Sequence, residues 1–159
     1  MLDLSNLSWV QLDEDERVRY LVEPGDILLV RTNGNSQYVG RSVVVKDVPP
    51  ETVFASYLIR LKTDPRRIRS DYLCALLNSE YLRKTLTHEI RSSAGNYNIN
   101  TQGIKRQKVP LPPLEDQDRI VEQVNGFESA KAELKNYIEQ ARGLKAHLVK
   151  SLMMPDNHS

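Results

Sequence analysis

The last quarter of the chain is the feature that most constrains its fold. From Leu114 to Met154, apolar residues recur at alternating spacings of three and four, which keeps one face of an α-helix toward a partner helix. A continuous helix of this span is about 60 Å long at 1.5 Å per residue, and no other segment is long enough to cover it. The pattern therefore predicts a helix that pairs with another long helix. The alternative is an ordinary core helix packed on its own domain.

Two lysines interrupt the apolar seam of this helix. Lys131 and Lys145 occupy equivalent heptad positions, where polar residues usually fix register and oligomer state at some cost in stability. Ala130, Tyr137 and Leu144 add a second apolar row, so the apolar face is wider than a minimal two-stranded coiled coil needs. The residues predicted to contact the partner helix are Ile120, Val124, Phe127, Leu134, Ile138, Ala141, Leu148 and Leu152.

Charge is distributed unevenly along the chain, although the net charge is only +1. Residues 60–108 carry 11 Lys or Arg and 4 Asp or Glu, a net charge of +7, whereas residues 1–59 have −4 and residues 109–159 have −2. A local basic excess is what a phosphate-contacting surface requires, because each neutralised phosphate releases counterions. The alternative is a solvated basic face that the acidic first third compensates.

Ahead of the long helix, the sequence begins with signals for a helix and a sheet. Acidic residues 13–16 predict a turn or a short helix start, and Pro24-Gly25-Asp26 predicts a turn. The apolar run 27–30 then predicts a buried strand. Asn33-Gly34 is the strongest short signal for a tight hairpin, because both residues tolerate positive φ. We expect the chain to return as a strand over 39–46 and to form another over 53–62.

From Ser70 the apolar spacing becomes helical. Ser70 or Asp71 is expected to cap a helix that breaks at Asn78-Ser79, and a second helical pattern runs to Ile90. Residues 92–103 are polar and predict a loop, and residues 105–111 predict an extended segment. The predicted fold class is α+β: a twisted, mainly antiparallel sheet with short helices, followed by one long C-terminal coiled-coil helix.

Catalysis finds little support in the sequence. His88, His147 and His158 are widely separated, and none has a Cys or His neighbour at metal-ligand spacing. Neither a glycine-rich phosphate loop nor a nucleophile elbow is present. The single cysteine, Cys74, excludes an internal disulfide framework and a multi-cysteine zinc site, and its apolar neighbours favour a buried, inert thiol. We therefore expect no enzymatic activity, no catalytic or metal-ligating residue and no cofactor.

Hydropathy gives no membrane signal. The chain has no apolar run of about 18 residues and no charged-then-apolar leader. We therefore expect no membrane partner and a cytoplasmic location.

Recognition of nucleic acid has more support, because two polar segments carry groups suited to base edges and phosphates. The first is the expected hairpin tip, and the second is the expected loop after residue 91. Basic residues between and after them would contact phosphates. The alternatives are a hairpin turn that contacts nothing and a solvated crossover into the helix. The candidate DNA-binding residues are Arg31, Thr32, Asn33, Asn35, Ser36, Gln37, Tyr38, Arg41, Arg66, Arg67, Arg69, Ser92, Ser93, Asn96, Tyr97, Asn98, Lys105 and Arg106.

Five short stretches precede or begin the long helix: Gly25-Asp26-Ile27-Leu28, then residues 31–35, 39–41, 98–104 and 109–117. In their order they resemble the DNA-specificity subunit of type I restriction-modification systems. Each stretch is short and only moderately specific, whereas their order ahead of a long helix is a strong combination. The similarity covers roughly Leu2 to Met154.

The resemblance implies a division of the chain and a set of partners. In that family, each of two target-recognition domains reads one half of a bipartite DNA sequence. Two long helices pair antiparallel as a spacer and dock the methyltransferase subunits. The resemblance implies that residues 1–108 are one recognition domain and that residues 109–159 form one helix for dimerisation and docking. The implied partners are double-stranded DNA, an adenine methyltransferase (modification) subunit and, through it, the restriction subunit; the family's specificity subunit is not itself catalytic.

The chain departs from the family pattern in two ways. It holds one recognition unit and one helix, so it reads as a half-subunit that forms a homodimer through the helix or pairs with another half-subunit. The family's recognition domain normally has further sequence before the point matching Leu2, so an N-terminally truncated domain is one expectation. The competing interpretation is a truncated interaction module that binds the methyltransferase subunit through its helix without reading DNA.

Overall fold

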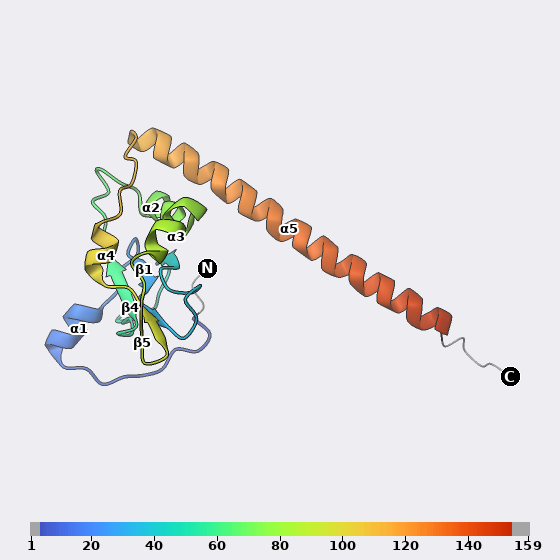
Figure 1. The fold of residues 1–159 in the computed structure, drawn as a ribbon, viewed down its shortest axis with the longest axis horizontal. Helices are drawn as coiled ribbons and strands as arrows, with labels where there is room; N and C mark the ends of the chain where they lie inside the picture. Colours follow the sequence, from blue (N-terminus) through green and yellow to red (C-terminus); the bar gives the residue numbers. More distant parts are fainter. Residues whose placement is uncertain (1–3, 154–159) are drawn as a thin grey trace. The chain divides into compact units, whose positions relative to one another are not determined.

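The computed structural model describes residues 4–153 and contains two compact units, Met1–Val121 and Glu122–Ser159. The elements run in the order α1 (Glu14–Tyr20), β1 (Ile27–Val30), β2 (Thr32–Asn33), β3 (Ser42–Val44), β4 (Leu58–Leu61), α2 (Ser70–Asn78), α3 (Glu80–Thr87), β5 (Arg91–Ser93), β6 (Asn96–Asn98), α4 (Thr101–Lys105) and α5 (Leu114–Met153) (Figure 1). Small antiparallel sheets, short helices and a long C-terminal helix confirm the predicted α+β class.

The first sheet has the strand order β3-β1-β4, and both pairings are antiparallel. Its central strand, β1, is apolar because both of its faces are covered. Ile27 and Leu29 are fully buried in the main core, together with apolar residues of α2, α3 and α4. Leu28 belongs to a second cluster with Val22 and Val45. The prediction of a buried strand over 27–30 is therefore confirmed.

The prediction of a tight hairpin at Asn33-Gly34 is wrong. Strands β1 and β3 do pair, but the chain between them leaves the first sheet, and residues 32–33 form β2 against β6. Neither Asn33 nor Gly34 has a positive φ, so the turn that this dipeptide favours does not form. Pairing with a distant strand satisfies the backbone of β2 and overrides the local signal. The returning strand is correspondingly short, Ser42–Val44 rather than 39–46.

The prediction of a loop over residues 92–103 is also wrong. This segment holds part of β5, all of β6 and the start of α4. Between the two strands, Ala94 (φ 48°) and Gly95 (φ 79°) both have a positive φ, the geometry of the commonest two-residue hairpin connection. The turn dipeptide is therefore Ala-Gly, which is a weaker sequence signal than Asn-Gly.

Three smaller differences concern element ends. The strand predicted over 53–62 is β4, Leu58–Leu61, and Val53 makes only an isolated bridge with Leu21. Lys105 lies in α4 rather than in an extended segment. Helix α2 has Arg69 at its N-cap without a side-chain cap, because the Ser70 hydroxyl donates instead to the carbonyl oxygen of Gly25.

The acidic helix start predicted at residues 13–16 is confirmed in α1. The Asp13 side chain accepts from the backbone N–H of Glu16, and the Glu16 side chain accepts from that of Asp13. This is a reciprocal capping box, which satisfies two otherwise free N–H groups. The turn before β1 also forms, since the Asp26 carboxylate accepts from the backbone N–H of Glu23.

The long helix is confirmed as α5. Its first turn belongs to the first unit, where Gln117 is fully buried. Over Glu122–Met153, every side chain that the structure describes is exposed. Leu134 and Leu148 of the predicted seam are 60% and 53% exposed; the side chain of Leu152 and the predicted helix end at Met154 lie outside the described residues.

Candidate nucleic-acid interface

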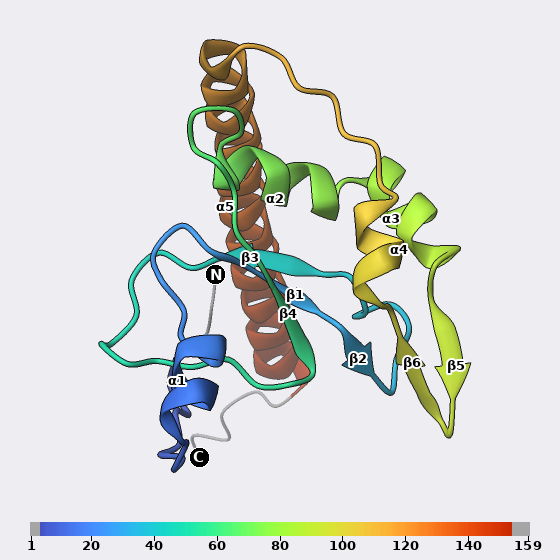
Figure 2. The ribbon, with the colours of Figure 1, turned by 90° about the vertical axis from the view of Figure 1, so that its left-hand side faces the viewer.

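The second sheet brings the two predicted polar segments together. Its strand order is β2-β6-β5, so the segment after β1 lies beside a hairpin more than sixty positions later in the chain (Figure 2). Thr32 pairs with Asn98, and Asn33 pairs with Tyr97. The Thr32 hydroxyl also donates to the Asn98 side-chain oxygen. Residues 91–93 of the outer strand are exposed. The fold thus makes one polar surface from two separate sequence patterns.

Arg31 lies at the junction of the two sheets and is held there by its backbone. Its N–H donates to the carbonyl oxygen of Tyr57 at 2.8 Å, and its own carbonyl oxygen accepts from Ile99 at 3.0 Å. The side chain is exposed. A fixed backbone beneath a free guanidinium suits a residue that reads a base edge, because an arginine fork can donate two parallel hydrogen bonds to guanine.

The loop after β2 is shaped by its own asparagines. The Asn33 side-chain oxygen accepts from the backbone N–H of Asn35 at 2.9 Å, and that of Asn35 accepts from Gln37 at 2.9 Å. Such bonds reproduce a backbone turn. The two side-chain oxygens are therefore used within the loop, and the NH₂ groups are the parts of Asn33 and Asn35 suited to an outside acceptor.

The end of this loop carries a cationic cluster of Arg41 and Arg83, of which the sequence indicates only Arg41. The Arg41 guanidinium lies over the Tyr38 ring, 4.4 Å from its centre, and its Nε donates to the carbonyl oxygen of Gln37. From α3, Arg83 donates to the carbonyl oxygens of Val39 at 2.6 Å and Gln37 at 2.8 Å. Arg83 was not among the predicted residues, because nothing local in the sequence indicates that α3 packs beside this loop.

The basic segment 66–69 lies elsewhere, at the start of α5. Arg69 forms an ion pair with Asp118, at 2.9 Å from Nε to the carboxylate oxygen, and Arg66 pairs with Asp64. The hydrogen bond and charge of Asp118 raise the pKa of Arg69, and the side-chain and backbone hydrogen bonds of Arg66 lower the pKa of Asp64. The backbone oxygen of Arg67 accepts from the buried Gln117. The structure therefore does not bring these three arginines to the second sheet.

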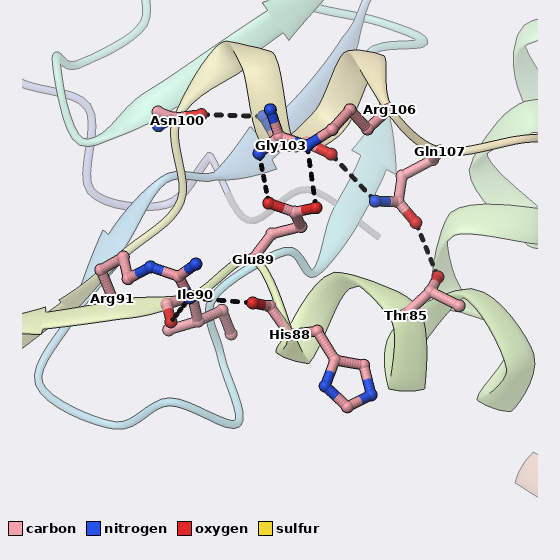
Figure 3. A network of polar contacts seen from close by, with 9 residues as sticks. All are labelled: Thr85, His88, Glu89, Ile90, Arg91, Asn100, Gly103, Arg106 and Gln107. Atoms are coloured by element: carbon pink, nitrogen blue, oxygen red, sulfur yellow. Dashed lines mark hydrogen bonds and ion pairs between the residues drawn. The ribbon is translucent and has the colours of Figure 1, made fainter.

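Lys105 and Arg106 follow the second sheet at the end of α4. Arg106 forms an ion pair with Glu89, and this hydrogen bond lowers the pKa of the Glu89 carboxyl (Figure 3). Nearby, Gln107 donates to the Gly103 carbonyl oxygen and accepts from Thr85. These contacts join α3 to α4. Both Lys105 and Arg106 are exposed, but the Arg106 guanidinium is engaged in the ion pair with Glu89.

Residues 4–153 hold neither a metal-binding cluster nor a membrane-spanning helix. No group of three or more His, Cys, Asp or Glu in this part of the chain could hold a metal ion. No helix there is long and apolar enough to cross a membrane. Burial raises the pKa of the Cys74 thiol, which disfavours the reactive thiolate.

Comparisons with known proteins agree on one family. The family described as "Type I restriction modification DNA specificity domain" matches residues 2–141. The type I restriction enzyme StySPI specificity subunit of Salmonella potsdam is 34% identical over 76% of this chain and 26% of its own length. The putative MjaX specificity subunit of Methanocaldococcus jannaschii is 24% identical over 95% of this chain and 36% of its own. The EcoKI specificity subunit of Escherichia coli (strain K12) is 23% identical over 96% of this chain and 33% of its own length. The aligned part of the chain thus spans between 26% and 36% of the length of these three relatives.

Proposed function

This chain belongs to the family of type I restriction-modification DNA specificity domains, and we propose that it is a non-catalytic subunit that recognises a specific double-stranded DNA sequence. The observation that carries the proposal is the second sheet. It joins the segment after Arg31 to the hairpin of β5 and β6, and so gathers polar and cationic side chains on one surface. Amide and guanidinium groups are the donors that distinguish base pairs in the major groove.

The recognised target is a split DNA sequence, and the chain functions as a dimer through its long helix. Helix α5 presents exposed apolar residues at heptad spacing, which favours pairing with a second long helix. In a homodimer the two recognition units read two identical half-sites in inverted orientation, because two-fold protein symmetry imposes two-fold symmetry on the target. The complex directs an adenine methyltransferase, and through it a restriction subunit, to that target.

The direct test of DNA reading is selection from a pool of random duplexes, followed by the variant Arg31→Lys. Lysine keeps the positive charge but lacks the planar fork that pairs with guanine. The backbone bonds of residue 31 do not depend on its side chain. We expect the variant to lose about 1–3 kcal/mol of discrimination at one base pair, with little change in affinity for scrambled DNA.

Two outcomes would contradict this assignment. Equal weakening on all sequences would make Arg31 a phosphate contact rather than a base-reading residue. Failure of the wild-type chain to bind any duplex in a salt-dependent manner would favour the competing function, a module that binds the methyltransferase subunit without reading DNA.

A further inference from the structure

A groove lies between the loop after β2 and helix α3, outside the second sheet. Arg41 and Gln37 line it from the loop, and Glu80, Arg83 and Lys84 line it from α3. Glu80 forms an ion pair with Lys84 at 2.8 Å. Among the described residues, no carboxylate forms an ion pair with Arg41 or with Arg83. Three cations therefore face one carboxylate, which leaves the groove with an excess positive charge of two.

The two arginines approach the same atom. Arg41 Nε and Arg83 Nη2 both donate to the carbonyl oxygen of Gln37, at 3.2 Å and 2.8 Å. A carbonyl dipole only partly compensates two guanidinium charges, and a guanidinium has five N–H donors, more than these bonds use. Burial, and then the charge of Arg41, lower the pKa of Arg83. An anion placed between the two groups would relieve this repulsion.

Packing around the groove fixes the positions of its two arginines. Helix α3 buries Leu82 and Leu86 in the main core, which fixes the direction of Arg83 on the adjacent face. Gly40 allows the approach, since a Cβ at this position would lie 2.8 Å from Arg83 Nη1. The Arg41 guanidinium also rests on the Tyr38 ring. The cations are thus held in place without their ligand, which reduces the entropy cost of binding.

We propose that this groove binds a phosphate group of the DNA backbone, with Arg41 and Arg83 as the contact residues and Lys84 at the rim. This inference rests on the proposed function and extends it to α3. A phosphate contact here sets the register of the recognition loop on the duplex, because Arg83 holds the backbone of Gln37 and Val39 directly. Sequence-independent contacts of this kind position the residues that read bases.

The test is the salt dependence of DNA binding by the full chain. The probes are the selected target duplex and a scrambled duplex of the same length. The double variant R83Q/K84Q is expected to reduce the magnitude of the slope of log K against log salt by about one, and to weaken binding to both duplexes. Lys84→Glu is the second variant, because this exposed side chain can change without removing the loop contacts of Arg83. It should lower affinity for both duplexes.

R17Q/R19Q is the matched control. It removes two positive charges from α1, the same charge change as in R83Q/K84Q, and its slope should equal that of the wild type. If the double variant and Lys84→Glu both match the control, the groove is not a phosphate site although the chain reads DNA. If the wild type binds no duplex, the proposed function and this inference both fall. Loss of target binding alone, with scrambled DNA unaffected, would also overturn the inference, since it would mark a base-reading role.

Discussion

Gly40 occupies a position that other residues cannot enter without strain. Its φ is +82°, and an added Cβ would also meet Arg83 and Leu86. A left-handed backbone costs an L-residue about 1–2 kcal/mol, and displacing Arg83 would break its bond to Val39. We expect Gly40→Ala to lower the free energy of unfolding by about 1–3 kcal/mol, measured by urea denaturation. Gly34→Ala is the control: its Cβ would meet nothing within 4 Å, so a change within about 0.5 kcal/mol is expected. Equal losses would show that the close approach of α3 to the loop has no energetic role.

The chemistry of the side chains marks residues 31–41 and 92–98 as candidates for DNA contact, and the second sheet pairs Thr32 and Asn33 of the first segment with Asn98 and Tyr97 of the second. Their contact with DNA stays a prediction. The sequence does not indicate Arg83, because its contacts with the loop depend on the packing of α3, which no local pattern reports. Arg69 and Arg106 have the expected charge, but each pairs with an acid that is distant in the sequence.

At the scale of elements, the first turn of α5 depends on one buried amide. Gln117 accepts from the backbone N–H of Arg69 and donates to the carbonyl oxygens of Arg67 and Pro112. It is fully buried, so truncation leaves three backbone groups without their partner. We expect Gln117→Ala to cost about 1–3 kcal/mol of unfolding free energy. Gln11→Ala, at an exposed position, should change stability little; an equal effect of both variants would contradict the structural role of Gln117.

Elements with strong periodicity were predicted well, and those fixed by distant pairing were not. The apolar run of β1 and the helical spacing of α2, α3 and α5 are local properties of the sequence. Strand β2 has only two residues, and its partner β6 lies beyond α2 and α3 in the chain. The Asn-Gly signal therefore misassigned the hairpin, whereas the true two-residue turn carries Ala94, which rarely adopts a positive φ.

For the whole molecule, the proposal requires that α5 pair with a second helix. Replacing Leu134 and Ile138 with glutamate puts charge into the seam, and burying unpaired carboxylates at a helix interface is unfavourable. We expect this double variant to be monomeric by light scattering where the wild type is dimeric. The matched control adds glutamate at Asn136 and Gln140, which have the same four-residue spacing on the other side of the helix. A dimer that persists in the seam variant would reject α5 as the interface.

The central claim is that this chain reads DNA and delivers an adenine methyltransferase to a split target. The most direct measurement is to co-express the chain with its methyltransferase subunit and to map methylated adenines on the host DNA. We predict one bipartite, palindromic motif, because two identical recognition units related by a two-fold axis read inverted half-sites. A soluble complex that methylates no specific motif would contradict the claim.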